Sequence, residues 1–206
     1  YNGGHAEVRT QVEAGNVQWH IVDMTPQDSL RGCDEGLLVE LDHSMWAPAP
    51  DGTPATEDFV DGALADCHVG NISWATVPAY DKTKVNGTPT SMADFWDVQK
   101  FPGRRGLRKV PRVNLEWALM ADGVANEDIY DVLGTKAGQD RAFAKMDEIK
   151  DHVVWWEAGA QPPQLLADGE VVFTTAYNGR LFNAMYVEKK PFAIMWGPQV
   201  LSLIHI

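Results

Sequence analysis

Short apolar segments alternate with helix-patterned segments along most of this chain, and this alternation constrains the fold more than any other feature. The apolar segments are predicted to be strands, over residues 19–22, 37–41, 70–77, 105–110, 153–156, 171–176 and 192–196. The segments between them are predicted to be helices, over residues 5–15, 26–36, 90–96, 114–121, 127–133, 138–150, 162–168 and a last one that ends near 189. This pattern is typical of an α/β fold in which helices cover both faces of a mostly parallel sheet.

Polar and aromatic residues are concentrated where the predicted strands end. In open α/β sheets ligands bind at the carboxyl ends of the strands, so these residues form the predicted ligand-binding set. They are Asp23, Thr25, Gln27, Trp74, Thr76, Glu157, Gln161, Tyr177, Asn178 and Arg180. Glu157 and Gln161 also precede a predicted helix whose first amides are placed to hold an anion or polar group.

Each of these residues also has a purely structural interpretation. The tryptophans near the strand ends are often core residues rather than platforms for a ligand. Asp23 is a candidate cap for the next helix, and Glu157 and Arg180 are candidate ion-pair partners. Tyr177 is compatible with a place in the core, provided that its hydroxyl group finds a partner.

The composition is that of a globular protein, with 206 residues, 45% of them hydrophobic, and a formal net charge of −12. This length is sufficient for one domain or two small lobes. The negative charge argues against a nucleic-acid partner, which requires a basic face. It is compatible with a cationic ligand and also with a solvated acidic surface. No apolar run approaches the roughly 20 residues of a membrane-spanning helix.

The chain contains no Gly-x-Ser-x-Gly elbow, no phosphate-binding glycine loop and no His-Glu-x-x-His pair. We therefore predict no catalytic residues and no cofactor. His43, Cys67 and His68 match no familiar metal-ligand spacing, so we predict no metal site and expect these histidines at the surface or in packing. Cys33 and Cys67 are either disulfide partners or buried free thiols, and the residues alone leave this choice open.

The predicted elements fall into two groups, which indicates two lobes. The first lobe comprises residues 1–76, a hinge follows at 77–81, the second lobe comprises 82–190, and residues 191–200 return to the first lobe. Residues 201–206 match the translation of a transposon-end adapter used in sequencing libraries. They are predicted to be a non-native tail, and the fold is expected to be incomplete at both ends.

Four segments of the chain are similar to one protein family. They are YNGGHAEVR at residues 1–9, EAGNVQW at 13–19, ADFWDVQKFPGRRGL at 93–107 and LLADGEV at 165–171. Together they resemble the spermidine/putrescine-type extracellular solute-binding proteins of bacterial ABC transporters, and the third segment is the most specific. The resemblance covers nearly all of residues 1–200. It implies a type II periplasmic binding protein fold, in which two lobes close on a small ligand.

The resemblance implies a periplasmic protein that delivers its ligand to a membrane permease. It implies a polyamine such as spermidine or putrescine as the ligand, with ammonium groups held by carboxylates and aromatic rings. Trp74, Glu157 and Tyr177 are the residues suited to this role. It also implies an oxidising compartment, which favours a Cys33–Cys67 disulfide.

Some residues depart from the polyamine-binding pattern. Gln27 stands where polyamine binders usually place an aromatic residue, and only Glu116 is near the expected acidic pair. Arg180 suits a carboxylate or phosphonate better than a diamine, so a binder of an acidic small molecule is an alternative. A sensor of the same fold and an enzyme on a similar scaffold are further rivals. A neighbouring permease gene would count against the sensor, and a nucleophile–base pair would favour the enzyme.

Overall fold

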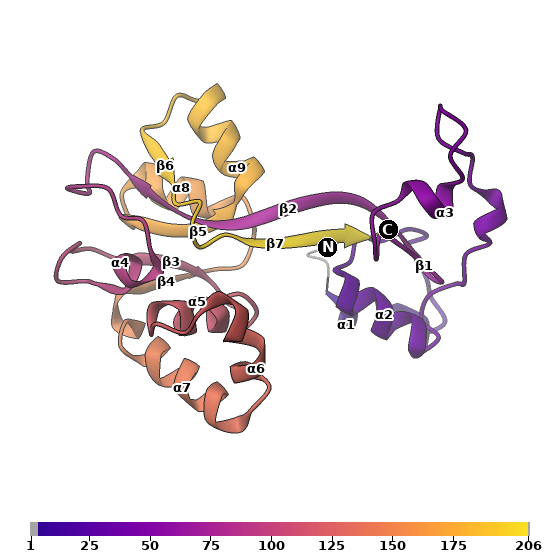
Figure 1. Cartoon of the computed structure of the whole chain (residues 1–206), viewed down its shortest axis with the longest axis horizontal. Coiled ribbons are helices and arrows are strands. Elements are labelled where there is room, and N and C mark those ends of the chain that lie inside the picture. The colour runs from indigo at the N-terminus through magenta and orange to yellow at the C-terminus, as the bar shows by residue number, and fades with distance from the viewer. Residues whose placement is uncertain (1–3, 206) are drawn as a thin grey trace. The chain divides into compact units, whose positions relative to one another are not determined.

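The computed structural model describes residues 4–205, with side chains described as far as Leu201 (Figure 1). Residues 1–3 of the predicted first lobe and residue 206 of the predicted tail lie outside the described part. The chain divides into two compact units. Unit 1 contains the residues up to Trp74 and from Leu201 onward, and unit 2 contains Ala75–Val200. Within the described part, no helix has the length and apolar character needed to cross a membrane.

Unit 1 combines short helices with the first part of a long strand. Its helices are α1 (His5–Glu13), α2 (Pro26–Asp34), the 3-10 turn η1 (His43–Met45) and α3 (Ala55–Asp58). Its strands are β1 (Leu64–Ala65), the start of β2 (His68–Asp81) and β7 (Val200–His205), and both β1 and β7 pair with β2. Helices α1 and α2 form where the sequence predicts them, and β2 contains the predicted strand over residues 70–77.

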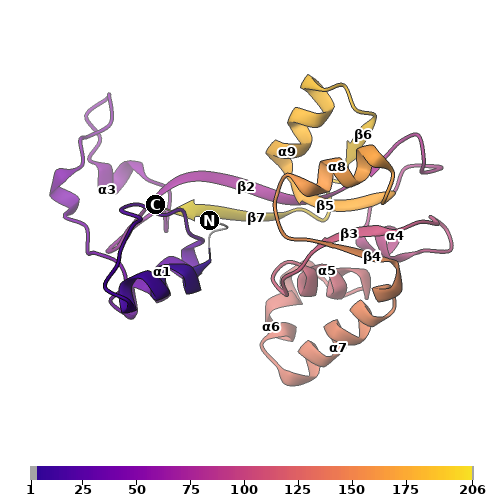
Figure 2. The same ribbon diagram turned by 180° about the vertical axis from the view of Figure 1, so that it is seen from behind.

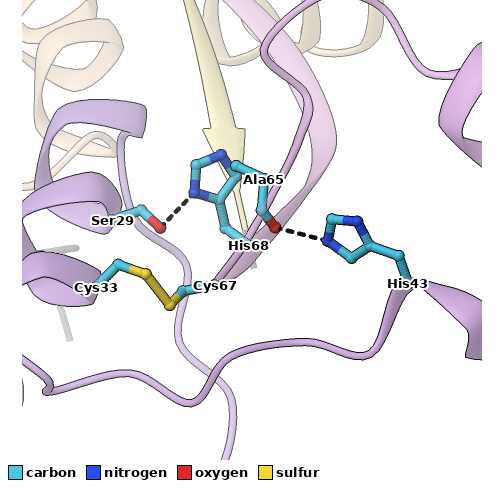
Figure 3. The surroundings of a disulfide bond; sticks show 6 residues. All are labelled: Ser29, Cys33, His43, Ala65, Cys67 and His68. Atoms are coloured by element: carbon cyan, nitrogen blue, oxygen red, sulfur yellow. Dashed lines mark hydrogen bonds between the residues drawn. A yellow bond between two sulfur atoms is a disulfide. The ribbon is translucent and has the colours of Figure 1, made fainter.

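A disulfide between Cys33 and Cys67 ties α2 to the residue that precedes β2 (Figure 3). The two cysteines are separated by 34 positions in the sequence, and closing a loop of this length stabilises a fold by about 4 kcal/mol in the chain-entropy model. Beside the disulfide, Oγ of Ser29 lies 2.8 Å from Nδ1 of His68, and both side chains are buried. Burial lowers the pKa of His68, so this packed ring is neutral at pH 7.

Two strands predicted in unit 1 are wrong. Residues 19–22 and 37–41 form no strand, and their apolar side chains include Ile21, which is 74% exposed, and Val39, which is 82% exposed. A strand is stable only when a neighbouring strand satisfies its backbone groups. Neither segment has such a ladder among the described residues, although the N–H of Leu41 donates one hydrogen bond of 2.6 Å to the carbonyl of Asp66.

Unit 2 is built on a mixed sheet in which the strand order is β6–β2–β5–β3–β4 (Figures 1 and 2). Its remaining strands are β3 (Arg105–Arg108), β4 (Val153–Trp156), β5 (Phe173–Tyr177) and β6 (Phe192–Ile194), and each overlaps a predicted strand. Strand β3 runs parallel to β4 and β5, whereas β2 runs antiparallel to β5 and β6. The sheet is thus less parallel than predicted, because only β3, β4 and β5 follow one another through helical crossovers.

Helices cover both faces of the sheet of unit 2, as predicted (Figures 1 and 2). One face packs against α4 (Met92–Trp96), α5 (Asn114–Ala121), α6 (Ile129–Leu133) and α7 (Lys136–Asp147). The other packs against α8 (Gln161–Asp168), α9 (Asn178–Phe182) and a π-helical turn (Asn183–Val187). Strand β5 contributes Phe173 to the first core and Ala176 to the second, because alternate strand residues point to opposite faces. The α/β class predicted from the sequence is confirmed.

Arg105 anchors the start of β3 from inside the protein. The side chain is 0% exposed, and its guanidinium donates hydrogen bonds only to main-chain oxygens. Nε donates to the carbonyl of Phe95 at 2.9 Å, Nη2 to those of Asp97 and Phe101 at 3.1 and 2.6 Å, and Nη1 to that of Gly103. Burial lowers the pKa of Arg105 to about 10, so it remains charged at pH 7. One cation therefore satisfies the turn between α4 and β3.

The division between the units differs from the predicted lobe boundaries. Residues 77–81 are the paired end of β2 in unit 2, since Val77–Tyr80 face β5 and Ala79–Asp81 face β6. Residues 191–200 also cluster with unit 2, because β6 pairs with this end of β2. Leu201 clusters with unit 1. The hinge at 77–81 and the non-native origin of residues 201–206 stay predictions.

Replacement of the buried guanidinium tests its structural role. We expect Arg105→Met to lower the free energy of unfolding by about 3 kcal/mol or more, because four main-chain carbonyl groups, two of them in buried hydrogen bonds, lose their donor. Urea denaturation followed by tryptophan fluorescence measures the change. Arg104→Met is the matched control, since Arg104 is exposed, and it should change the free energy by less than about 0.5 kcal/mol. Equal effects of the two substitutions would contradict the role of Arg105.

Candidate ligand-binding site

The carboxyl ends of three parallel strands meet at one edge of the sheet of unit 2. Strand β3 ends at Arg108, β4 at Trp156 and β5 at Tyr177. The register pairs Arg108 with Trp156, and Thr76 of β2 with Tyr177. This is the edge at which open α/β sheets bind ligands. The structure therefore brings together residues that lie about a hundred positions apart in the sequence at the place where a site is expected.

An aromatic pair and a guanidinium form the centre of this edge. The rings of Trp156 and Tyr177 meet edge to face with their centroids 5.9 Å apart. Cζ of Arg108 lies 5.9 Å from the centroid of each ring. Trp156 is only 1% exposed, so its ring is fixed by packing and gives a rigid support to its two neighbours. This arrangement places a positive charge beside aromatic faces, which attract it.

The loop between β4 and α8 is held in place by Gln161. Its Oε1 accepts hydrogen bonds from the N–H groups of Glu157 and Ala158, at 2.8 and 2.7 Å. Gly159, in the same loop, lies against Tyr177, because a Cβ atom on this glycine would stand 2.7 Å from Cε2 of the ring. The loop thus supports the ring of Tyr177 from one side. Glu157 and Ala158 precede α8 (Gln161–Asp168), so their amides are not the helix amides predicted to hold an anion, and that role of the helix stays a prediction.

Asn178 and Thr76 complete the edge beside Tyr177. Oδ1 of Asn178 accepts a hydrogen bond of 3.1 Å from the N–H of Ala75, which joins the start of α9 to β2. Thr76 is buried at the register position opposite Tyr177. Asn178 therefore fixes the geometry of the edge through its side-chain oxygen.

Glu157 and Arg180, which the sequence suggested as ion-pair partners, do not pair with each other among the ion pairs of the described residues. Glu157 pairs with Lys109, with Nζ and Oε1 3.4 Å apart, and both side chains are exposed. A surface pair of this kind contributes little to stability. Arg180 lies exposed in α9. The charged side chains described near the strand ends are Arg108, Lys109, Glu157 and Arg180, and all of them except Glu157 are positive.

Four predicted site residues belong to unit 1. Thr25 is the N-cap of α2: its Oγ1 accepts from the N–H of Asp28 at 3.4 Å and donates to Oδ2 of the same residue at 2.8 Å. The cap is thus Thr25 and not Asp23, which is exposed. Gln27 is also exposed, and Trp74 is half-buried in β2. A ligand-binding role for these four residues stays a prediction.

The histidines expected at the surface or in packing lie near the disulfide. Nε2 of His43 donates to the carbonyl of Ala65 at 3.1 Å, and His68 is buried beside Ser29 (Figure 3). Among the residues that the structure describes, no group of three or more His, Cys, Asp or Glu side chains is arranged to hold a metal ion.

The sequence did not predict Arg108 as part of this edge, whereas the interpretation of Trp156 as a core residue agrees with its burial. The predicted strand over residues 105–110 extends beyond the real end of β3 at Arg108, so this arginine was placed inside a strand instead of at its end. The signal that distinguishes it is the pair Arg108-Lys109 directly before Val110 and Pro111, where a strand of the sheet has to stop. Gly159 also escaped notice as a contact, since only the fold reveals its neighbour.

A family model described as "Bacterial extracellular solute-binding protein" matches residues 1–205. The chain belongs to this family. The family confirms the predicted class, a solute-binding transport protein and not an enzyme, together with the expected periplasmic location.

Two similar proteins refine the comparison. The chain is 50% identical to the gamma-aminobutyric acid-binding protein of Pseudomonas aeruginosa over 196 aligned residues. The alignment covers 95% of this chain and 53% of that protein. It is 34% identical to the binding protein MotA of A. tumefaciens B6, whose structure was solved in complex with glucopine. The two structures superpose with a TM-score of 0.88, and the match covers 98% of this chain and 61% of MotA. The chain thus spans about half the length of its curated relative.

The resemblance to spermidine/putrescine binders holds only at the level of the fold. The spermidine/putrescine-binding protein PotD of Streptococcus pneumoniae is 15% identical, with a TM-score of 0.68, covering 98% of this chain and 61% of PotD. The proteins described above are more similar in sequence, and none of their names refers to a polyamine. The solute-binding class is therefore confirmed, while the polyamine subfamily is not.

The contact between Gly159 and Tyr177 is open to a direct test. We expect Gly159→Ala to lower the free energy of unfolding by about 1–3 kcal/mol, because the new methyl group overlaps the ring and displaces it. Thermal unfolding measures the change. Gly179→Ala is the matched control, since no atom lies within 4 Å of the added carbon. A stability of Gly159→Ala equal to that of the control would show that the ring is not held by this loop.

Proposed function

We propose that the protein is the periplasmic solute-binding component of an ABC transporter and that its ligand is a small amino acid of the γ-aminobutyrate class. Such a ligand carries one ammonium group and one carboxylate. The protein would bind it at the strand-end site of unit 2 and deliver it to a membrane permease. The role of a relative that is 50% identical, a gamma-aminobutyric acid-binding protein, supports this proposal.

The charge of the site is the observation that carries the choice of ligand. The described strand ends present Arg108 and Arg180, while the nearby carboxylate of Glu157 is paired with Lys109. A diamine requires carboxylates, whereas a guanidinium binds a carboxylate through charge-assisted hydrogen bonds. The half-buried ring of Tyr177, which rests against the buried Trp156, offers an apolar surface for the short alkyl chain of the ligand. A ligand with a free carboxylate fits these groups better than spermidine or putrescine.

A thermal-shift and calorimetric titration of the full-length protein tests the proposal. The ligands are γ-aminobutyrate, putrescine and glutarate, which differ in whether each end carries an ammonium group or a carboxylate. We expect γ-aminobutyrate to bind most tightly, with a stabilisation of about 2.7 kcal/mol at a concentration of 100 times Kd. Binding of putrescine alone would contradict the proposal and restore the polyamine ligand. Binding of glutarate alone would indicate an acidic solute.

A further inference from the structure

We propose that Asn86 is a site of spontaneous covalent modification, at which the side-chain carboxamide is lost and the main chain rearranges. The proposal is independent of the proposed function, because it rests on one exposed turn of unit 2. The sequence contains three Asn-Gly pairs, at residues 2–3, 86–87 and 178–179. The second and third pairs lie in the part of the chain that the structure describes.

The reaction of an Asn-Gly pair requires only water. The main-chain nitrogen of the glycine attacks Cγ of the asparagine, and the bond between Cγ and the side-chain nitrogen breaks. Ammonia leaves with the proton of the glycine amide, and a cyclic succinimide remains. Water then opens this ring at either carbonyl, which gives aspartate or isoaspartate. Asparagine is accordingly among the labile residues of proteins, and glycine favours the attack because it has no side chain beside the nitrogen.

Asn86 lies in a short exposed arc of the loop between β2 and α4 (Figure 1). Before it, Val85 is 7% exposed and packs in the core of unit 2, and its N–H donates to the carbonyl of Asp81 at 3.2 Å. After it, Pro89 is buried. The arc over residues 86–88 is exposed and connects these two anchored points.

Both reacting groups of this pair are accessible. Among the described residues, neither the N–H of Gly87 nor the carboxamide of Asn86 has a hydrogen-bond partner. Gly87 has a φ of +96°, and no atom lies within 4 Å of the position that a Cβ atom would take. The carboxamide is therefore free to rotate towards the main-chain nitrogen, and the space beside that nitrogen is open.

Asn178 and Gly179 form the same pair in a different environment. Oδ1 of Asn178 accepts a hydrogen bond of 3.1 Å from the N–H of Ala75, and both residues of the pair belong to α9. A succinimide ring is incompatible with the helical conformation of its asparagine. Reaction at Asn178 thus requires loss of this hydrogen bond and unwinding of the first turn of α9. The fold predicts different fates for two pairs that are identical in sequence.

Peptide mapping by mass spectrometry tests the site on the folded full-length protein, incubated at mildly alkaline pH and digested with trypsin at intervals. The two pairs are separated in the tryptic peptides 85–100 and 151–180. We expect Asn86 to lose its carboxamide about 10-fold faster than Asn178 or more, the factor that corresponds to one hydrogen bond that must first break. Peptide 85–100 should contain isoaspartate together with aspartate, whereas direct hydrolysis of the side chain yields aspartate alone.

Two controls isolate the effect of the fold. In urea both pairs should react at similar rates, because the dipeptide is the same and the folded environment is lost. Asn86→Gln retains a carboxamide but would have to form a larger ring, so the mass change of peptide 85–100 should become slow. Equal rates at Asn86 and Asn178 in the folded protein, or aspartate without isoaspartate at residue 86, would overturn the proposal.

The modification should also destabilise the folded protein, because isoaspartate inserts an additional main-chain carbon between Val85 and Pro89, which are both anchored. Asn86→Asp is the matched control, since it introduces the same charge without the additional carbon. We expect the isoaspartate form, separated by ion exchange, to have a lower Tm than the fresh protein, and Asn86→Asp to have the Tm of the fresh protein. Equal Tm values for all three would contradict this consequence of the modification.

Discussion

The parallel register of β3 between β4 and β5 determines how Arg108, Trp156 and Tyr177 lie relative to one another. It aligns Arg108 with Trp156 and places both next to the end of β5 at Tyr177. A slip of one residue would turn Arg108 to the opposite face of the sheet and bring Leu107 into its place. The site therefore depends on what holds β3, and that is the buried guanidinium of Arg105 together with the core around Phe173.

Two arginines three positions apart thus have different tasks. Arg105 donates to main-chain carbonyls, is fully buried, and has a pKa lowered to about 10 by burial. Arg108 is partly exposed at the strand end, where aromatic rings hold its guanidinium. The alternation of side chains along a strand separates the two. Arg105 satisfies the turn before β3, and Arg108 belongs to the strand-end edge that we propose as the ligand site.

The sequence was sufficient to predict most of unit 2, because its apolar segments are short and are separated by segments that form helices, such as Asn114–Ala121 and Lys136–Asp147. It was less successful in unit 1, where Ile21 and Val39 lie in apolar segments that have no strand ladder among the described residues. It identified Tyr177 at the end of its strand but missed Arg108. The predicted strand ended at residue 110, two positions beyond the end of β3, and Arg108 was therefore assigned to the interior of the strand. No local sequence signal shows that the rings of Trp156 and Tyr177 lie beside it.

A crystal structure of the full-length protein with γ-aminobutyrate bound would test the strand-end site directly. We expect the carboxylate to lie within about 3 Å of the guanidinium nitrogens of Arg108, with the alkyl chain near Tyr177. Gln161 should keep its hydrogen bonds to the amides of Glu157 and Ala158. A carboxylate bound at those amides, or far from Arg108, would show that the guanidinium at the end of β3 does not hold the ligand.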